Sequence, residues 1–329
     1  MAPHHRSCRL RLVVALFVAT LALTACNSAP SGPTGTFPAT VTHRYGQTVV
    51  PEEPERVVSL GYTDQDAILV LGTVPVAVRE FVGNRPAATW PWAVDRLRGA
   101  QPQVLPAGEV TPDAVAALRP DLIIAISASL TREQYDAYST IAPTVAAPNG
   151  VADFGTPWRD ATRLTGAALG LPGEADRLVA DTEEKFLRAE EDNPELAGGT
   201  VAAVEASPAD PGSIAAAGSK DRRAQFLTEL GVQVPAEVDQ LAGDQPTATL
   251  NAEQLTALSQ ADALMVLGTE SERAAVTALP GYAQLPAVQD SKVVTLDDEE
   301  SAALAFATVL SLPSVLDSLP RRLGRAVDR

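Results

Sequence analysis

Short, mainly apolar runs alternate along this chain with segments in which apolar residues recur every three or four positions. Residues 56–60, 75–78 and 121–126 are such runs, and they predict strands covered on both faces of a parallel sheet. Between the first two runs, residues 64–71 have helical periodicity and are followed by Gly72, a favoured residue just after a helix. Strands that alternate with helices are typical of an α/β fold.

The second half of the chain repeats this alternation. Residues 200–205, 262–267 and 292–296 predict strands, and the helices are expected at residues 222–230, 252–259 and 301–319. Between the two halves, residues 158–169 and 174–192 predict two helices. The second has about 19 residues and would span roughly 28 Å, enough to bridge two lobes.

A short internal repeat in the sequence supports a division into two lobes. Thr111 is followed by Pro112 and Asp113, and Asn251 by Ala252 and Glu253. Each group places a capping residue before a carboxylate at the second helical position, and each precedes a predicted strand. A generic helix–strand unit would produce the same pattern by chance, so both origins remain open.

The N-terminus predicts an export signal. Residues 1–25 contain three arginines and no acid, and their apolar run at 12–23 is short for a membrane span. They end in Leu23-Thr24-Ala25-Cys26, which resembles the lipobox of bacterial lipoproteins. We therefore expect a lipid anchor on Cys26 and a Gly/Pro/Ser-rich tether over residues 26–40. The alternative is an ordinary signal peptide with an incidental cysteine.

Composition excludes several classes of function. The 329 residues carry 25 Lys and Arg against 41 Asp and Glu, a net charge of −16, which argues against a nucleic-acid partner. Removal of residues 1–25 would make the net charge −19. Three histidines and two cysteines are too few for a histidine-rich metal site, an iron–sulfur cluster or a disulfide framework. No G-x-S-x-G, P-loop or G-x-G-x-x-G motif is present, so we expect no enzyme and no resident cofactor.

Several sequence pieces occur together in a characteristic order. They are Tyr45-Gly46-Gln47-Thr48-Val49-Val50, Pro54-Glu55-Arg56-Val57-Val58-Ser59-Leu60, Gly61-Tyr62-Thr63-Asp64-Gln65-Asp66, Trp90-Pro91-Trp92, Ala117-Leu118-Arg119-Pro120-Asp121-Leu122-Ile123 and Ile141-Ala142-Pro143-Thr144-Val145. With these pieces the chain resembles the substrate-binding lipoproteins of ferric-siderophore, haem and cobalamin ABC importers over about residues 41–322. The third and fourth of these six pieces, around Tyr62 and Trp90, are most similar to a ferric-siderophore-binding branch.

The resemblance implies a fold and a division into domains. It implies two Rossmann-like α/β lobes joined by one long rigid helix, with a ligand cleft between them. The expected N-terminal lobe covers residues 41–172, the linking helix residues 173–193 and the C-terminal lobe residues 194–329. Residues 1–25 are the expected signal peptide.

Ligand-binding candidates are drawn from scarce aromatic and cationic residues. Aromatic faces grip large planar iron complexes, and cationic donors meet the iron-bound oxygens. Trp90 and Trp92 are expected in a loop at the cleft edge, and Tyr62 directly follows a strand, where α/β sheets bind ligands. For each of these three residues the alternative is simple packing in the fold. The cationic candidates are Arg79, which would otherwise be a solvated loop charge, and either Arg222 or Arg223. Trp158 is expected to pack in the core.

The resemblance also assigns Asp113 and Glu253 to docking. In this family an acid at each position contacts arginines of the permease, one per lobe. The alternative is that each acid complements its helix dipole, a contribution of about 0.3–1 kcal/mol.

The sequence therefore predicts an exported, lipid-anchored and monomeric protein that captures a ferric siderophore for an ABC permease and its ATPase. The low number of candidate arginines and the acidic chain favour a hydroxamate or mixed-ligand complex over a highly anionic one. A haem or cobalamin carrier of the same fold is the main alternative. A binder of bare ferric ion is less consistent, since the Tyr135 and Tyr138 pair is better explained as a helix face and His43 stands alone.

Overall fold

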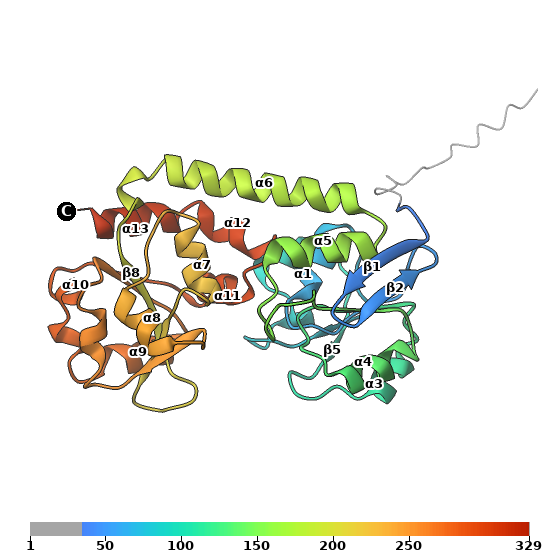
Figure 1. Ribbon diagram of the computed structural model, residues 1–329, viewed down its shortest axis with the longest axis horizontal. Coiled ribbons are helices and arrows are strands. Elements are labelled where there is room, and N and C mark those ends of the chain that lie inside the picture. Colours follow the sequence, from blue (N-terminus) through green and yellow to red (C-terminus); the bar gives the residue numbers. More distant parts are fainter. Residues whose placement is uncertain (1–34, 329) are drawn as a thin grey trace, which may run out of the picture. The chain divides into compact units, whose positions relative to one another are not determined.

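The structure, a computed structural model, describes residues 35–328 of the chain. These residues form two α/β lobes, each built on a five-stranded sheet, and the long helix α6 (Pro172–Glu191) runs along both (Figure 1). The expected signal peptide, Cys26 and most of the expected tether lie outside the described residues.

The N-terminal lobe has an all-parallel sheet in the order β5-β4-β3-β6-β7. Its strands are β3 (Val57–Ser59), β4 (Ala77–Arg79), β5 (Gln103–Leu105), β6 (Leu122–Ala125) and β7 (Thr144–Ala146). The helices of this lobe are α1 (Asp64–Val70), α2 (Pro91–Val94), α3 (Pro112–Ala117), α4 (Arg132–Ser139) and α5 (Trp158–Ala168), with 3₁₀ turns η1 (Pro86–Ala88) and η2 (Asp95–Leu97). All residues of β3, β6 and β7 are buried, as expected for strands covered on both faces.

A β-hairpin that the sequence reasoning missed precedes this sheet. Strands β1 (Ala39–His43) and β2 (Gly46–Val50) pair antiparallel across a two-residue connection, with Gly46 at a φ of +122°. In β1 buried and exposed positions alternate, so one face of the hairpin packs on the core. Residues 39–40, placed at the end of the expected tether, therefore belong to a strand.

The C-terminal lobe has a mixed sheet in the order β10-β9-β8-β11-β12. Its strands are β8 (Val201–Ala206), β9 (Ile214–Ala217), β10 (Thr247–Leu250), β11 (Ala263–Val266) and β12 (Val293–Thr295). β8, β11 and β12 are parallel, whereas β9 runs antiparallel to both of its neighbours. The remaining elements are η3 (Pro194–Leu196), α7 (Arg222–Thr228), α8 (Ala236–Ala242), η4 (Leu255–Leu258), α9 (Glu270–Thr277), η5 (Tyr282–Gln284), α10 (Pro286–Gln289), α11 (Asp298–Phe306), α12 (Ser311–Leu316) and α13 (Leu319–Val327).

Helix α6 contributes to the hydrophobic cores of both lobes. Its buried positions recur at helical spacing along one stripe. Ala175, near its start, packs in a core cluster of the N-terminal lobe, whereas Val179, Phe186 and Ala189 pack in a core cluster of the C-terminal lobe. With 20 residues the helix is about 30 Å long. One straight element is thus fixed to both lobes by apolar contacts.

Two expected helices differ in the structure. The helix expected over residues 301–319 is wrong as one element, because Ala307 has left-handed backbone angles (φ 47°, ψ 58°) that separate α11 from α12. After this break, Ser311 Oγ accepts the Thr308 N–H at 2.9 Å and donates to the Ala303 carbonyl at 2.7 Å. The helix expected over residues 252–259 is a turn followed by η4. Its counterpart α3 has Pro112 at the first helical position, which favours a helix start.

The break between α11 and α12 forms a direct contact between the lobes. The hydroxyl of Thr308, in the C-terminal lobe, donates to Oδ2 of Asp66 in α1 at 2.5 Å. The same carboxylate oxygen accepts the indole N–H of Trp92 at 3.0 Å. Asp66 is 1% exposed, so this contact is closed to solvent.

Ion pairs reinforce the same junction. The Arg159 guanidinium in α5 contacts Glu229, at the end of α7, through two hydrogen bonds of 2.8 and 2.9 Å. Its Nε donates to Glu183 of α6 at 2.5 Å. These hydrogen bonds to Glu229 and Glu183 raise the pKa of Arg159, so the guanidinium stays charged. Arg159 therefore links one element of the N-terminal lobe, one of the C-terminal lobe and the linking helix.

The buried Asp66 makes stability depend on pH. Burial raises its pKa to about 6, although the hydrogen bonds from Thr308 and Trp92 lower it. Because the pKa is raised, the Asp66 carboxyl binds its proton more tightly in the folded protein than in the unfolded chain. The stability that the proton provides is complete below about pH 4 and is lost as the pH rises through about 6. The ionised carboxylate therefore costs roughly 3 kcal/mol at neutral pH.

We predict that Asp66→Asn increases the free energy of unfolding at about pH 7.5 by roughly 1–3 kcal/mol, because the amide oxygen accepts both hydrogen bonds without a charge. The gain should shrink as the pH falls towards about 4, where wild-type Asp66 is also neutral. Urea unfolding of both proteins across this range measures the difference.

Asp66→Ala is the matched control, because it leaves Trp92 and Thr308 without their acceptor. We expect this variant to be less stable than wild type at every pH. A gap between the Asn variant and wild type that stayed constant with pH would contradict the assignment.

Candidate functional site: the cleft between the lobes

The candidate site lies where the carboxyl ends of both sheets meet. In parallel sheets the loops that follow the strands lie at one edge, and ligands bind there. Residues 80–90 follow β4 in the N-terminal lobe. In the C-terminal lobe, residues 267–272 follow β11 and residues 296–305 follow β12.

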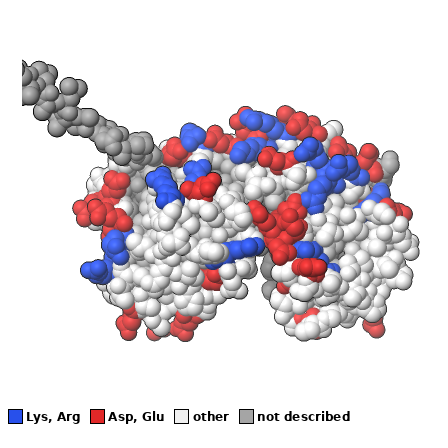
Figure 2. Space-filling model, turned by 180° about the vertical axis from the view of Figure 1, so that it is seen from behind, with Lys and Arg blue, Asp and Glu red and all other residues white. Residues whose placement is uncertain are grey.

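These loops enclose a cavity of about 320 Å³ between the lobes. In the space-filling view a notch separates the lobes, and acidic side chains gather near its inner end (Figure 2). The N-terminal lobe contributes Val82, Gly83, Arg85 and Trp90. The C-terminal lobe contributes Glu205, Gly268, Thr269, Glu272, Asp298, Ser301, Ala302 and Ala305. Small-molecule sites have volumes of this order, about 300–1,000 Å³.

Trp90 and Trp92 form a parallel stack beside this cavity. Their ring centroids are 5.4 Å apart, with an interplanar angle of 2°. The backbone differs from the loop expected here, since Trp92 lies in α2 and Pro91 is its first residue, a favoured place for proline. Trp90 lines the cavity, while Trp92 stands behind it and donates to Asp66. Gly83 makes this possible, because a Cβ at its φ of +90° would clash with the Trp90 ring.

A row of six aromatic rings runs from Phe154 to Trp90, the member of the row that lines the cavity. Successive centroids are 5.2–5.8 Å apart, a spacing typical of aromatic pairs. The order of the rings is Phe154, Tyr62, Phe81, Phe306, Trp92 and Trp90. Phe306 belongs to the C-terminal lobe and is 2% exposed, so the row continues from one lobe into the other. The two lobes thus share a continuous set of aromatic contacts next to the cavity.

Tyr62 and Arg79 lie together at one end of this row. The Arg79 guanidinium carbon is 4.1 Å from the centroid of the Tyr62 ring. Arg79 donates to the carbonyls of Ala107 and Gly108 at 3.1 and 2.6 Å, and the Tyr62 hydroxyl donates to the Ala107 carbonyl at 2.7 Å. Arg79 is therefore half-buried and engaged with backbone, and neither residue lines the 320 Å³ cavity.

The two candidate arginines of α7 have different environments. Arg223 makes ion pairs with Glu205 and with Asp221, the latter at 2.7 Å. Burial lowers its pKa, but the hydrogen bonds and charges of these two carboxylates outweigh that effect and raise the pKa overall. Arg222 is bonded to backbone carbonyls of Phe306 and Phe154, and its burial lowers its pKa. Arg223 is thus held behind the cavity wall, while Arg222 joins the C-terminal lobe to Phe154 of the N-terminal lobe.

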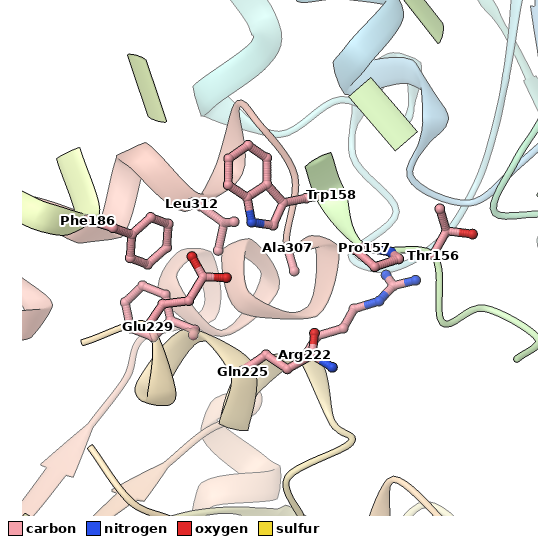
Figure 3. A pocket seen from close by; sticks show the side chains of 10 residues that line it. Thr156, Pro157, Trp158, Phe186, Arg222, Gln225, Glu229, Ala307 and Leu312 are labelled. Carbon is pink, nitrogen blue, oxygen red and sulfur yellow. The ribbon is translucent and has the colours of Figure 1, made fainter. Parts of the chain in front are cut away.

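A small cavity of about 20 Å³ lies beneath this junction, beside Trp158, Phe186 and Leu312 (Figure 3). Arg222 extends past it towards Thr156. The cavity has room for about one water molecule, far less than a ligand needs. Trp158 is 8% exposed and belongs to a core cluster, so its side chain packs in the interior.

Asp113 and Glu253 are both exposed and lie at the starts of α3 and of the turn before η4. Each follows the carboxyl end of a strand, β5 or β10, at the same edge of its sheet as the cleft. Within residues 35–328 the structure shows no ion pair for either carboxylate. Both are therefore open to a partner.

Among the residues that line the cavity, sequence reasoning named Trp90 but missed the charged side chains and also three rings of the aromatic row. The missed residues are Arg85, Glu205, Glu272, Asp298, Phe81, Phe154 and Phe306. Phe81 and Arg85 follow β4, and Phe154 lies beyond β7, so their positions after strands were an available signal. Phe306 had no such signal, because its role depends on the break at Ala307. Tyr135, Tyr138 and His43 are all buried in the N-terminal lobe, and burial lowers the pKa of His43.

Over residues 35–328 no helix combines the length and apolar character that a membrane crossing requires. In the same part of the chain, no three His, Cys, Asp or Glu side chains are grouped as metal ligands.

Comparison with known proteins agrees with this geometry. A family model described as periplasmic binding protein matches residues 57–300. The chain is 32% identical over 177 residues to YhfQ of Bacillus subtilis (strain 168), which is named for substrate binding in an ABC transporter and as a lipoprotein. This alignment covers 53% of the chain and about half of YhfQ, 54%.

Two solved structures match most of the chain. A periplasmic solute binding protein from Mycobacterium smegmatis (strain MC2 155) is 34% identical, with a TM-score of 0.79, and the match covers 88% of this chain and 98% of that one. PiaA from Streptococcus pneumoniae TIGR4, in complex with ferrichrome, is 26% identical, with a TM-score of 0.73 and the same coverage. Together with the two-lobed fold and its cleft, these matches show that the chain belongs to the periplasmic binding protein family, whose role is to bind substrates and not to transform them.

Proposed function

We propose that this protein captures a ferric siderophore in the cleft between its lobes and delivers it to the permease of an ABC importer. The observation that carries the proposal is the 320 Å³ cavity at the carboxyl ends of both sheets, with the Trp90 ring on its wall. Aromatic faces suit the large apolar surface of a ferric chelate. The ferrichrome complex of PiaA supports the same class of ligand.

In this proposal the protein needs no metal ligands of its own, because the siderophore holds the iron. The protein contributes a shaped cavity, the Trp90 ring and the polar side chains that line the cavity from both lobes. Closure of the lobes would exclude water from the chelate. Asp113 and Glu253 would then present one carboxylate per lobe to arginines of the permease.

We further propose that Cys26 carries the lipid anchor and holds the protein at the outer face of the cell membrane. The name of YhfQ as a lipoprotein supports this proposal. Cys26→Ala should release the protein from the membrane fraction or leave it unprocessed, because the acylated thiol is then missing. Fractionation of cells and immunoblotting measure the change, and normal processing with membrane retention would contradict the anchor.

The cleft assignment predicts saturable quenching of tryptophan fluorescence by ferric siderophores. Ferric chelates absorb strongly and quench nearby indoles. Trp90 lines the cavity, and the Trp92 ring is stacked on the Trp90 ring. We expect Trp90→Phe to remove much of the quenching and to weaken binding roughly threefold to tenfold, since aromatic contacts contribute about 0.5–1.5 kcal/mol. Titration with ferric siderophores, haem and cobalamin also separates the proposed ligand from its two alternatives.

Trp158→Phe is the control for this titration, because Trp158 is buried outside the cavity and its indole N–H has no partner among the described residues. This variant should retain both the affinity and the loss of signal upon binding. The site would have to be reassigned if Trp158→Phe abolished quenching and Trp90→Phe did not.

The docking assignment predicts a loss of uptake without a loss of binding. The double variant Asp113→Ala with Glu253→Ala should bind ferric siderophore with wild-type affinity, while uptake through the cognate permease falls at least fivefold. Loss of either acid should cost at most about 1 kcal/mol of stability. Radioactive iron uptake and a binding titration measure the two quantities.

Glu53→Ala with Glu237→Ala is the matched control. Both acids are exposed, and both lie near the amino edges of their sheets, where strands β3 and β8 begin. This control removes the same charge from each lobe and should leave uptake unchanged. Equal uptake by the two double variants would assign Asp113 and Glu253 a purely structural role.

A further inference from the structure

The two walls of the 320 Å³ cavity carry opposite charge. On the N-terminal lobe, Arg85 lines the cavity, and its guanidinium carbon lies 4.3 Å from the centroid of the Trp90 ring. On the C-terminal lobe, three carboxylates line it: Glu205, Glu272 and Asp298. These come from the ends of three neighbouring strands, because Glu205 lies in β8, Glu272 follows β11 and Asp298 follows β12.

The acidic wall is not neutralised by its own basic residues. Glu205 shares Arg223 with Asp221, so that group keeps one carboxylate in excess. Asp298 pairs with Arg273 at 3.0 Å and is still 51% exposed. Glu272 forms no ion pair within residues 35–328. One of its oxygens, Oε2, accepts from the backbone N–H and the hydroxyl of Thr269 at 2.7 and 2.8 Å. Its other oxygen, Oε1, takes no part in that capping box and accepts no hydrogen bond from residues 35–328, so it is available to a ligand.

The opposite wall presents one cation on an aromatic surface. Arg85 is exposed and, unlike those of Arg79, Arg222 and Arg223, its guanidinium forms no hydrogen bond or ion pair with the described residues 35–328. The cation–π contact with the indole uses none of the guanidinium N–H groups as hydrogen-bond donors to other residues, so these donors remain free. Iron-bound hydroxamate or catecholate oxygens are acceptors for such donors.

We infer that the ligand is a ferric chelate with a positively charged side arm, bound so that its iron-bound oxygens face Arg85 and its protonated amine faces Glu272 and the neighbouring carboxylates. This inference rests on the proposed function and deepens it by naming the charge of the ligand. A highly anionic chelate would meet three carboxylates across the cavity, and an uncharged arm would leave the carboxylate of Glu272 without a counterion.

The test compares two ligands that differ in one charge. Ferrioxamine B is a ferric trihydroxamate with a free ammonium group, and its N-acetyl derivative has the same chelate without that charge. We expect ferrioxamine B to bind about fivefold to tenfold more tightly at low salt, because exposed ion pairs contribute up to about 1 kcal/mol each. The difference should shrink at roughly 0.5 M NaCl, where screening is strong. Ferric enterobactin, an anionic triscatecholate complex, should bind more weakly than either.

Variants assign the preference to the acidic wall. Glu272→Gln keeps the capping acceptor for Thr269 but removes the charge, so it should reduce the ratio of the two affinities about twofold to fivefold. Its matched control is Glu270→Gln, an exposed acid in the same first turn of α9 that does not line the cavity. This control should leave the ratio unchanged. Arg85→Gln should weaken both ligands by a similar factor, because it acts on the shared chelate.

The outcomes separate the inference from the proposed function. Equal affinities for ferrioxamine B and its N-acetyl derivative, or tighter binding of ferric enterobactin, would overturn the inference and leave a siderophore-binding protein. Failure of every ferric chelate to bind would overturn both. An affinity ratio that depends on Glu272 and not on Glu270 supports the inference.

Discussion

One carboxylate oxygen, Oδ2 of Asp66, holds the junction on which the cleft depends. It accepts the indole N–H of Trp92 from its own lobe and the hydroxyl of Thr308 from the other. Because Asp66 is buried, these two bonds replace solvation that the carboxylate has lost, and neither donor is easily exchanged for water. The contact fixes Trp92, and the stacked Trp90 then stands at the cavity wall. The hydrogen bond to Asp66 thereby fixes the position of the apolar surface that the two indole rings form beside the cavity.

The cavity offers two kinds of interaction. It is lined by the Trp90 ring, which ends a row of aromatic rings that includes Phe306 of the C-terminal lobe, and by Arg85 on one side and carboxylates on the other. Contact with the rings depends on area and shape and discriminates little between chelates of similar size. Charged groups at the walls discriminate between ligands of different charge and also attract them over a distance. The aromatic and the charged residues thus supply different kinds of interaction in one cavity.

The sequence predicted the features that arise from local patterns. Buried strands such as β6, the linking helix α6 and the α/β class follow from apolar runs and helical periodicity. The sequence did not predict the hairpin of β1 and β2, since its two short strands have no continuous apolar run.

It also did not predict the cleft residues whose positions depend on contacts between distant segments. Asp66 and Thr308 are 242 residues apart, and no local pattern indicates that they meet. For Arg79 and Arg223 the residue type suggested ligand contact, but the folded chain supplies other partners. The predicted role of Trp90 at the cleft edge remains a prediction, although its ring does line the cavity.

The buried stripe of α6 packs in the cores of both lobes and therefore constrains the length of this helix. Each residue inserted into an α-helix turns everything beyond it by about 100° and advances it by about 1.5 Å. An insertion between Ala175 and Val179 would therefore rotate one lobe's core off the helix face while the other stayed in place. Substitutions along the exposed face of α6 have no such effect. The residues on that face can therefore vary, whereas the number of residues in the helix cannot change without displacing one lobe.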